Sequence, residues 1–476
     1  MSRINTNVAA LTAQRGLNKS QTALNGTLER LSTGLRINRG ADDPAGLIAS
    51  ESLRSEISGI KQAIDNGQRA SNVIATAEAS LSEVANLLLN VKDLVVEAAN
   101  SGALSREEVE ANQLQVDSAI ESITRISNTT TFAGLRLIDG SLDYITSGAS
   151  NSAFTSLQIN QANFGSADQI PVNVEVIQSA QQAELQFTAS AVANTVTLEI
   201  NGVEGVDTLT FASGTGAAAI ASAVNRISDV TGVKAEMINS ADPNDGLSFV
   251  SAAWGSRAFV SVKAQSGAFD TVDVDGAQRT RDEGRDAKAT VNGALTVGDG
   301  LKVKLNTSTL DMELELNEDF GQGQTAFAIT GGGALFQLGS KVTANQQVNL
   351  GISSVAASKL GDNAIGYLND VVSGGNSTLI GNRADRASKI IEKAIQQVAV
   401  MRGRLGAFEK NTLDTSMNSQ QIALENVTAS ESTIRDADFA QETAQLTRNQ
   451  ILTQAGTSVL ATANSSPQQV LSLLQR

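Results

Sequence analysis

The chain has 476 residues, of which 41% are hydrophobic, so it is long enough for about three domains with buried cores. Its net charge is −15 and only 3% of its residues are aromatic, which excludes the basic patch and stacking surfaces of a nucleic-acid-binding protein. We expect protein partners, and neither nucleic acid nor a membrane. The absence of cysteine excludes disulfides and thiolate sites, and the absence of histidine excludes Ser-His-Asp and Cys-His catalysis.

The sequence has no uninterrupted apolar run of about 18 residues, the length that spans a bilayer. The stretch 87–96 comes nearest, but it is broken by Asn90, Lys92 and Asp93. Residues 1–7 are polar and lack the charged-then-apolar order of a secretory signal. If the protein leaves the cell, we expect an export route that does not depend on a cleaved signal.

The N-terminal part has the hydrophobic periodicity of helices, and a first helix is predicted over 4–35. Asp43 then reads as an N-cap and Pro44 as the first helical residue, which predicts a long helix over 44–100. A further helix is predicted over 105–128. The apolar stripe of the first helix consists of Ile4, Val8, Leu11, Leu17, Leu24, Leu28, Leu31 and Leu35.

The C-terminal part is helical again, with helices predicted over 383–411, 417–432 and 438–476. One long helix from each end of the chain carries apolar residues at alternating spacings of three and four, the pattern of a coiled-coil seam. The seam residues are Ile74, Ala77, Leu81, Val84, Leu88, Val91, Val95 and Ala98, and Ala387, Ile391, Ala394, Val398, Met401, Leu405 and Phe408. We expect the helices of the two ends to pack on each other.

Between the helical parts, the pattern changes to the alternation of short strands, separated by Asn-Gly and Asp-Gly turns. Strands are predicted over 172–177, 195–200, 209–211, 247–251, 259–262 and 301–305, and one helix over 216–228. The fold class predicted is a mainly α core of long antiparallel helices with a terminal coiled coil and an inserted α+β, β-rich outer domain.

This reading divides the chain into three domains. Residues 1–40 and 436–476 form an inner terminal coiled-coil domain. Residues 41–175 and 331–435 form a helical core domain with a β-hairpin. Residues 176–330 form a solvent-exposed outer domain rich in β-structure.

Motifs at both ends resemble those of the bacterial flagellins, the subunits of the flagellar filament. The N-terminal motifs are Ile4-Asn5-Thr6-Asn7, Leu31-Ser32-Thr33-Gly34-Leu35-Arg36-Ile37-Asn38 and Ala41-Asp42-Asp43-Pro44-Ala45-Gly46-Leu47. The C-terminal motifs are Ser432-Thr433-Ile434-Arg435-Asp436-Ala437-Asp438, Asn449-Gln450-Ile451-Leu452-Thr453-Gln454-Ala455 and Ala463-Asn464-Ser465-Ser466-Pro467-Gln468-Gln469-Val470-Leu471. The resemblance covers 1–140 and 380–476. In the middle, 197–203 and 217–227 resemble the hook-type motif of flagellin outer domains.

The resemblance implies a secreted structural subunit that polymerises into the extracellular bacterial flagellum for swimming motility. It implies that the terminal arms pair and carry polymerisation. The arm residues expected to do so are Ile4, Val8, Leu11, Leu24, Leu28, Leu31, Leu35, Leu446, Ile451, Leu452, Leu460, Val470, Leu471 and Leu474. The partners it implies are many copies of the same chain, hook-associated and cap proteins, and an export chaperone on the C-terminal arm. No cofactor, metal or catalytic residue is expected.

Flagellins of enteric type are recognised by an animal Toll-like receptor through the first long helix and its neighbour. The matching positions here are Asn90, Leu94 and Gln115. Strong activators typically have arginine in the place of Asn90 and glutamate in the place of Gln115, whereas Leu94 is retained. Because loss of a charged anchor commonly costs about 2 kcal/mol or more, we expect weak recognition.

Other interpretations compete with a filament subunit. The hook–filament junction protein shares the terminal design, and a surface adhesin would use the exposed middle. An enzyme would need carboxylate-pair or Ser-Lys chemistry, which no spacing supports. The pairs Asp42/Asp43 and Asp436/Asp438 fit helix caps better than a metal site.

Overall fold

The computed structural model describes residues 6–100, 102–165, 167–239, 242, 245–307, 309–381 and 383–474, with side chains described up to residue 466. The chain forms two compact units. The terminal unit consists of Met1–Gln68, Leu338–Val342 and Thr412–Arg476, and the central unit of Arg69–Gln337 and Thr343–Asn411. Helix α2 (Pro44–Ala98) contributes residues to both units.

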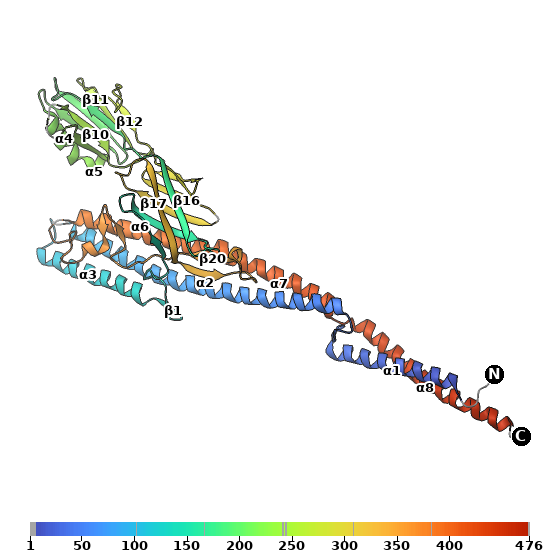
Figure 1. Ribbon diagram of the computed structural model, residues 1–476. Helices are drawn as coiled ribbons and strands as arrows, with labels where there is room; N and C mark the ends of the chain where they lie inside the picture. Colours follow the sequence, from blue (N-terminus) through green and yellow to red (C-terminus); the bar gives the residue numbers. More distant parts are fainter. Residues whose placement is uncertain are drawn as a thin grey trace. The chain divides into compact units, whose positions relative to one another are not determined.

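Two helices from opposite ends of the chain lie side by side in the terminal unit. Helix α1 (Val8–Thr33) packs along α8 (Phe439–Leu474), and Figure 1 shows the start of α1 and the end of α8 at the same end of this pair. The Asn7 side chain caps the start of α1, and Gly34 ends it with a φ of 72°, a left-handed conformation that glycine adopts without strain. The predicted pairing of N- and C-terminal helices is confirmed.

Side chains cap the starts of two long helices, and the sequence predicts the first of these caps. Helix α2 begins at Pro44, and the Gly46 N–H donates to Asp43 Oδ1 over 2.9 Å. Helix α3 (Arg106–Thr129) opens with a capping box between Ser105 and Glu108. These side chains satisfy amides that have no partner within the helix, so the sequence determines both starts locally.

The two predicted seams form a helical core in the central unit. Every seam residue of α2 and of α6 (Ala384–Phe408) is buried within a single chain. Antiparallel contacts accompany them, with Lys92 Nζ 3.1 Å from Glu392 Oε1 and Ser71 Oγ donating to Glu409 Oε1 over 2.5 Å. A short π-helix (Glu409–Leu413) follows α6 and leads into α7 (Asp414–Arg435). The seams are therefore an intramolecular core.

The middle of the chain has two hydrophobic cores, each between antiparallel sheets. The first lobe contains the order β14 (Ala294–Leu295), β13 (Lys288–Val291), β5 (Ile170–Gln178), β18 (Gly323–Gly332), β3 (Tyr144–Ser147), and the order β15 (Val297–Asp299), β16 (Lys302–Asn306), β17 (Leu310–Leu316), β4 (Phe154–Ala162). On β5, Val172, Val174 and Val176 alternate into this core. That alternation follows from the two-residue period of a strand.

The second lobe has its own core, made by two sheets and a helix. Its sheets have the orders β12 (Arg281–Glu283), β11 (Phe259–Ser266), β7 (Val196–Asn201), β8 (Val206–Phe211) and β6 (Glu184–Phe187), β10 (Leu247–Ser251), β9 (Val233–Met237). Helix α4 (Ala217–Arg226) adds Ile220 and Val224 to this core, and the short α5 (Ser228–Thr231) follows. The lobe closes where Gln181 and Arg285 exchange two backbone hydrogen bonds of 2.7 and 2.9 Å.

Short elements complete the central unit. They are β1 (Thr131–Phe132) with β2 (Leu135–Arg136), β19 (Ala334–Gln337) with β20 (Gln347–Leu350), β21 (Gly361–Asp362) with β22 (Gly366–Tyr367), and the 3₁₀ helices Ala344–Gln346 and Leu368–Val371. All six predicted strands and the predicted middle helix are present, so the fold class is confirmed. The prediction missed β17, although Leu310, Met312, Leu314 and Leu316 alternate strictly with charged residues.

Candidate assembly site

The base of the terminal helix pair is held by backbone hydrogen bonds. The Arg36 N–H donates to the Arg435 carbonyl over 2.7 Å, and the Ala437 N–H donates to the Gly34 carbonyl over 2.9 Å. Leu35 and Asp436 form an isolated antiparallel bridge between them. This short ladder brings the end of α1 beside the start of α8 and so determines where the pairing begins.

The contact between α1 and α8 is polar near its base. Among the described residues of the two helices, the buried side chains are Thr27 and Asn449, and Asn449 Nδ2 donates to Thr27 Oγ1 over 3.1 Å. Closer to the base, Arg30 Nε donates to Glu442 Oε1 over 2.8 Å. Farther from the base, Gly456 packs against Leu17, whose Cα would lie 3.6 Å from a Cβ at that position.

The predicted arm residues divide into exposed and half-buried groups. Val8, Leu11, Leu28, Ile451 and Leu452 are exposed, with Val8 62% and Ile451 61% accessible. Leu24, Leu31, Leu35, Leu446 and Leu460 are half-buried. Ile4 lies outside the described residues, as do the side chains of Val470, Leu471 and Leu474. Phe439 and Val459 are also exposed apolar residues of α8 that the prediction missed. Val459 lies seven residues after Leu452, a helical spacing that could have indicated it.

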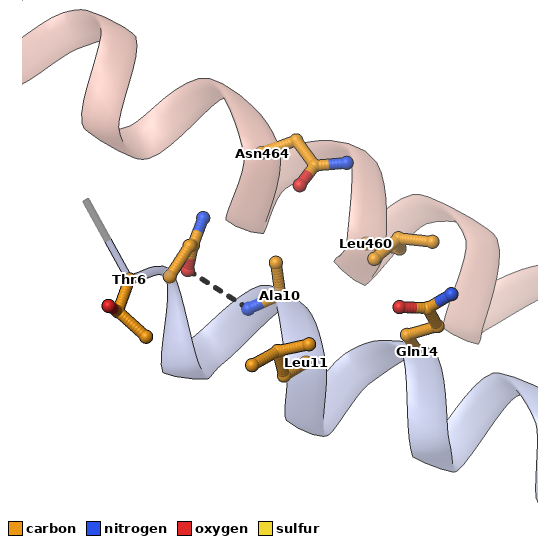
Figure 2. A pocket seen from close by; sticks show the side chains of 7 residues that line it. Thr6, Ala10, Leu11, Gln14, Leu460 and Asn464 are labelled. Carbon is orange, nitrogen blue, oxygen red and sulfur yellow. Dashed lines mark hydrogen bonds between the residues drawn. The ribbon is translucent and has the colours of Figure 1, made fainter. Parts of the chain in front are cut away.

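A groove lies between the two helices near the free end of the pair. It has a volume of about 450 Å³ and is lined by Thr6, Asn7, Ala10, Leu11, Gln14, Leu460 and Asn464. Figure 2 shows α1 and α8 lining it from opposite sides. The Asn7 side chain forms two hydrogen bonds at this groove. Its Oδ1 accepts from the Ala10 N–H over 3.0 Å, and its Nδ2 donates across to the Ala463 carbonyl of α8 over 2.8 Å. The lining combines side-chain amides with leucines.

Three residues of the acidic pairs, Asp42, Asp43 and Asp438, cap helices or turns. Asp42 Oδ2 accepts from the backbone N–H groups of Arg39 and Asn38, over 2.9 and 3.1 Å, and these bonds lower the pKa of the Asp42 carboxyl. Asp438 Oδ1 accepts from the Ala440 N–H over 2.8 Å at the start of α8. The described residues contain no cluster of three potential metal ligands.

Ion pairs lie beside these caps in the terminal unit. Arg435 donates to Glu51 Oε1 over 2.8 Å, and Arg54 donates to the same oxygen over 3.0 Å. Both hydrogen bonds lower the pKa of the Glu51 carboxyl, the one from Arg435 more strongly. One face of α2 is therefore tied to the last turn of α7.

The predicted receptor positions lie on α2 and α3. Asn90 and Gln115 are exposed, and Leu94 is half-buried. The exposed apolar residues Leu89 and Val96 lie on the same helix as Asn90, and Leu114 precedes Gln115 on α3. In the described part of the chain, none of the helices combines the length and hydropathy of a membrane span.

The fold and the arms define a structural protein, in which the two ends of the chain pair as helices and a β-rich middle is inserted between them. The bacterial flagellin N-terminal helical region matches residues 4–143, the bacterial flagellin C-terminal helical region matches 388–474, and the flagellin hook IN motif matches 197–253. The chain is 32% identical to the B-type flagellin of Pseudomonas aeruginosa over 508 residues, covering 99% of both chains. It is 29% identical to a flagellin of Salmonella typhimurium, again with 99% of both chains covered.

The chain therefore belongs to the bacterial flagellin family. It is a structural subunit of the extracellular flagellar filament, which serves motility. Among solved structures, the flagellar junction protein of Legionella pneumophila is 12% identical with a TM-score of 0.28, and covers 81% of this chain and 99% of that one. The D2-D3 domains of the flagellar cap protein of Escherichia coli are 20% identical with a TM-score of 0.29, covering 39% of this chain and 98% of that one.

Proposed function

We propose that residues 1–40 and 436–476 form the inner domain of the filament and join neighbouring subunits through their exposed apolar side chains. Residues 41–175 with 331–435 would form the next layer, and 176–330 would face solvent. The arm residues proposed for these contacts are Ile4, Val8, Leu11, Leu24, Leu28, Leu31, Leu35, Leu446, Ile451, Leu452, Leu460, Val470, Leu471 and Leu474.

The observation that carries the proposal is the apolar surface that the arm pair leaves exposed. A helix pair that is stable alone buries its apolar stripe and exposes its polar face. Here Leu28, Ile451 and Leu452 are exposed, while the buried side chains among the described residues are Thr27 and Asn449. Burying each large apolar side chain against a neighbouring copy is worth about 1.5–3 kcal/mol. The outward stripe therefore favours association of many copies over an isolated chain.

Substitution of an outward residue tests this proposal. Ile451→Ser removes about 1.5–3 kcal/mol of burial for every subunit that docks there, so seeded growth should slow at least tenfold. Gln450→Ser changes the exposed neighbour on the same helix and should leave growth unchanged. Growth is measured by light scattering and by electron microscopy of filament length. Equal growth of both variants would show that subunits join elsewhere.

We propose further that the chain acts only as a structural element, because it lacks the histidine and cysteine on which most nucleophilic sites depend. Its proposed partners are other copies of the chain, hook-associated and cap proteins at the filament ends, and an export chaperone. The apolar residues Ile451, Leu452 and Val459 would be the surface that the chaperone covers before assembly. Reduced chaperone binding by Ile451→Ser in calorimetry, with unchanged binding by Gln450→Ser, is the expected result.

We propose that an animal Toll-like receptor recognises this chain weakly through Asn90, Leu94 and Gln115. The two exposed positions carry uncharged amides, which cannot form the charge-assisted hydrogen bonds of an arginine or a glutamate. Leu94 is half-buried and offers the receptor only part of its surface.

A further inference from the structure

The pairing of α1 with α8 contains a polar contact at a place where an apolar one would bind more strongly. Thr27 is 1% exposed and Asn449 is 8% exposed, and they are hydrogen-bonded to each other. Thr27 Oγ1 also donates to the Ala23 carbonyl over 2.9 Å, so its oxygen is oriented to accept from Asn449. A buried amide needs such a partner, because an unpaired one loses its hydration without compensation.

The same two helices bury few apolar side chains against each other, so apolar contacts alone distinguish poorly between alignments. The half-buried leucines are Leu17, Leu24 and Leu31 on α1, and Leu446 and Leu460 on α8. A shift by one turn moves one helix about 5.4 Å along the other. It would separate Asn449 from Thr27 and Glu442 from Arg30.

We propose that the Thr27–Asn449 hydrogen bond is the specificity-determining contact that selects the register of the arm pair. A single buried asparagine has this role in coiled coils, where it lowers stability but excludes shifted alignments. The Arg30–Glu442 ion pair is half-exposed on the arginine side and supports the same alignment more weakly. The selected register presents Leu11, Leu28 and Ile451 in one constant pattern to the next copy.

This inference rests on the proposed assembly through the arms, but its test measures the register of α1 against α8 directly. The chain has no cysteine, so introduced pairs are the only thiols. A Cβ at Gly456 would lie 3.6 Å from the Cβ of Leu17, within the range that a disulfide spans. Leu17→Cys with Gly456→Cys therefore reports the native register. Leu17→Cys with Leu460→Cys, or with Thr453→Cys, reports a shift by one turn in either direction.

Each cysteine pair is introduced into the full-length chain with Thr27 and Asn449 unchanged. Disulfide formation is then followed in unassembled protein and in filaments. We expect the native pair to cross-link at least about tenfold faster than either shifted pair, because a shift leaves a buried amide unpaired. With Thr27→Val and Asn449→Leu together, the native cysteine pair should cross-link only about threefold faster than the shifted pairs, or less. No buried polar group then opposes the shift. We call this ratio of cross-linking rates the register preference.

Two further variants complete the experiment. Thr22→Val with Asn25→Leu makes the same chemical changes at exposed positions of α1. This variant should keep the register preference of the unchanged chain. Thr27→Asn with Asn449→Thr exchanges the partners and should restore it. An unchanged preference in the apolar variant would overturn the inference, as would the loss of all cross-linking, which would mean that the contact holds the helices together. The amount of filament formed reports separately on assembly through the arms.

Discussion

Gly59 of α2 and Ser340 lie so close that a Cβ on Gly59 would stand 3.0 Å from the Ser340 carbonyl oxygen. The segment Leu338–Val342, which comes from far along the chain, belongs to the same terminal unit as this part of α2. A glycine inside a long helix costs about 1 kcal/mol relative to alanine. Here the glycine allows the backbone at Ser340 to pack directly on α2.

Gly59→Val should release this segment. Overpacking against a backbone carbonyl costs about 1–3 kcal/mol, since the carbonyl cannot rotate away as a side chain would. Trypsin cleavage after Lys341 should therefore accelerate about tenfold, the factor that corresponds to 1.4 kcal/mol of easier local opening. Gly403→Ala, at a position of α6 with nothing within 4 Å of the new Cβ, should leave cleavage unchanged. Equal cleavage of the two variants would contradict the packing argument.

The turn between α1 and α2 should loosen in acid. The hydrogen bonds from Arg39 and Asn38 lower the pKa of Asp42, so its folded-state pKa lies below the unfolded value. Such a carboxyl stabilises the fold above its unfolded pKa of about 3.9, and this contribution disappears as the pH falls through the folded pKa. Carbon NMR of selectively labelled aspartate should give an Asp42 pKa below the usual value. Asp42→Asn should make the amides of Asn38 and Arg39 exchange faster at neutral pH, and an unperturbed Asp42 titration would refute this account.

Removal of the second lobe should leave assembly intact. Gln181 and Arg285 are already hydrogen-bonded neighbours, so deletion of 182–284 joins two adjacent backbone segments. The core of the first lobe keeps all its strands, and thinner filaments are expected by electron microscopy. Deletion of 191–320 serves as a contrast, because it also removes β16 and β17 and leaves the edge of β4 without its partner strand. That variant should aggregate, and failure of the smaller deletion to form filaments would show that the lobe joins subunits.

Restoring charge should strengthen receptor signalling. Asn90→Arg with Gln115→Glu places two charged groups at exposed positions of α2 and α3, where each can form charge-assisted hydrogen bonds. At about 2 kcal/mol for a charged anchor, the half-maximal concentration of monomer should fall by at least tenfold. The pair Asn90→Gln and Gln115→Asn keeps both positions uncharged. Its half-maximal concentration should equal that of the unchanged chain. A reporter-cell titration in which all three proteins coincide would reject the assignment.

The arms should be labile before assembly and protected afterwards. Their helices bury few side chains within one chain, and helices take most of their stability from packing. Trypsin should cut monomers first after Arg15, Lys19 and Arg448, and filaments much more slowly at these sites. Within α6, Arg402 lies among buried seam residues and should be cut late in both forms. Monomers that resist cleavage in α1 and α8 would show that the arms are stable without neighbours.

The sequence by itself determined the long helices, their caps and their seams. Ile74 to Ala98 and Ala387 to Phe408 repeat at helical spacing, and Asp43 and Ser105 satisfy amides within four residues of themselves. Such signals are local, so a reader of the sequence can recover them without knowing the fold. The flagellin motifs at both ends are equally local, so they indicate the family without knowledge of any contact.

Tertiary structure decided which side chains of the arms face each other. Apolar periodicity in α1 predicts a stripe, but it cannot tell whether the stripe meets α8 or another copy, and the buried partners proved to be Thr27 and Asn449. The closure of the second lobe depends on Gln181 and Arg285, which are far apart in sequence. Hydrogen bonds between distant residues leave no periodic signal along the chain, because each needs only one suitable atom at each end. Their identity emerges only when the chain has folded.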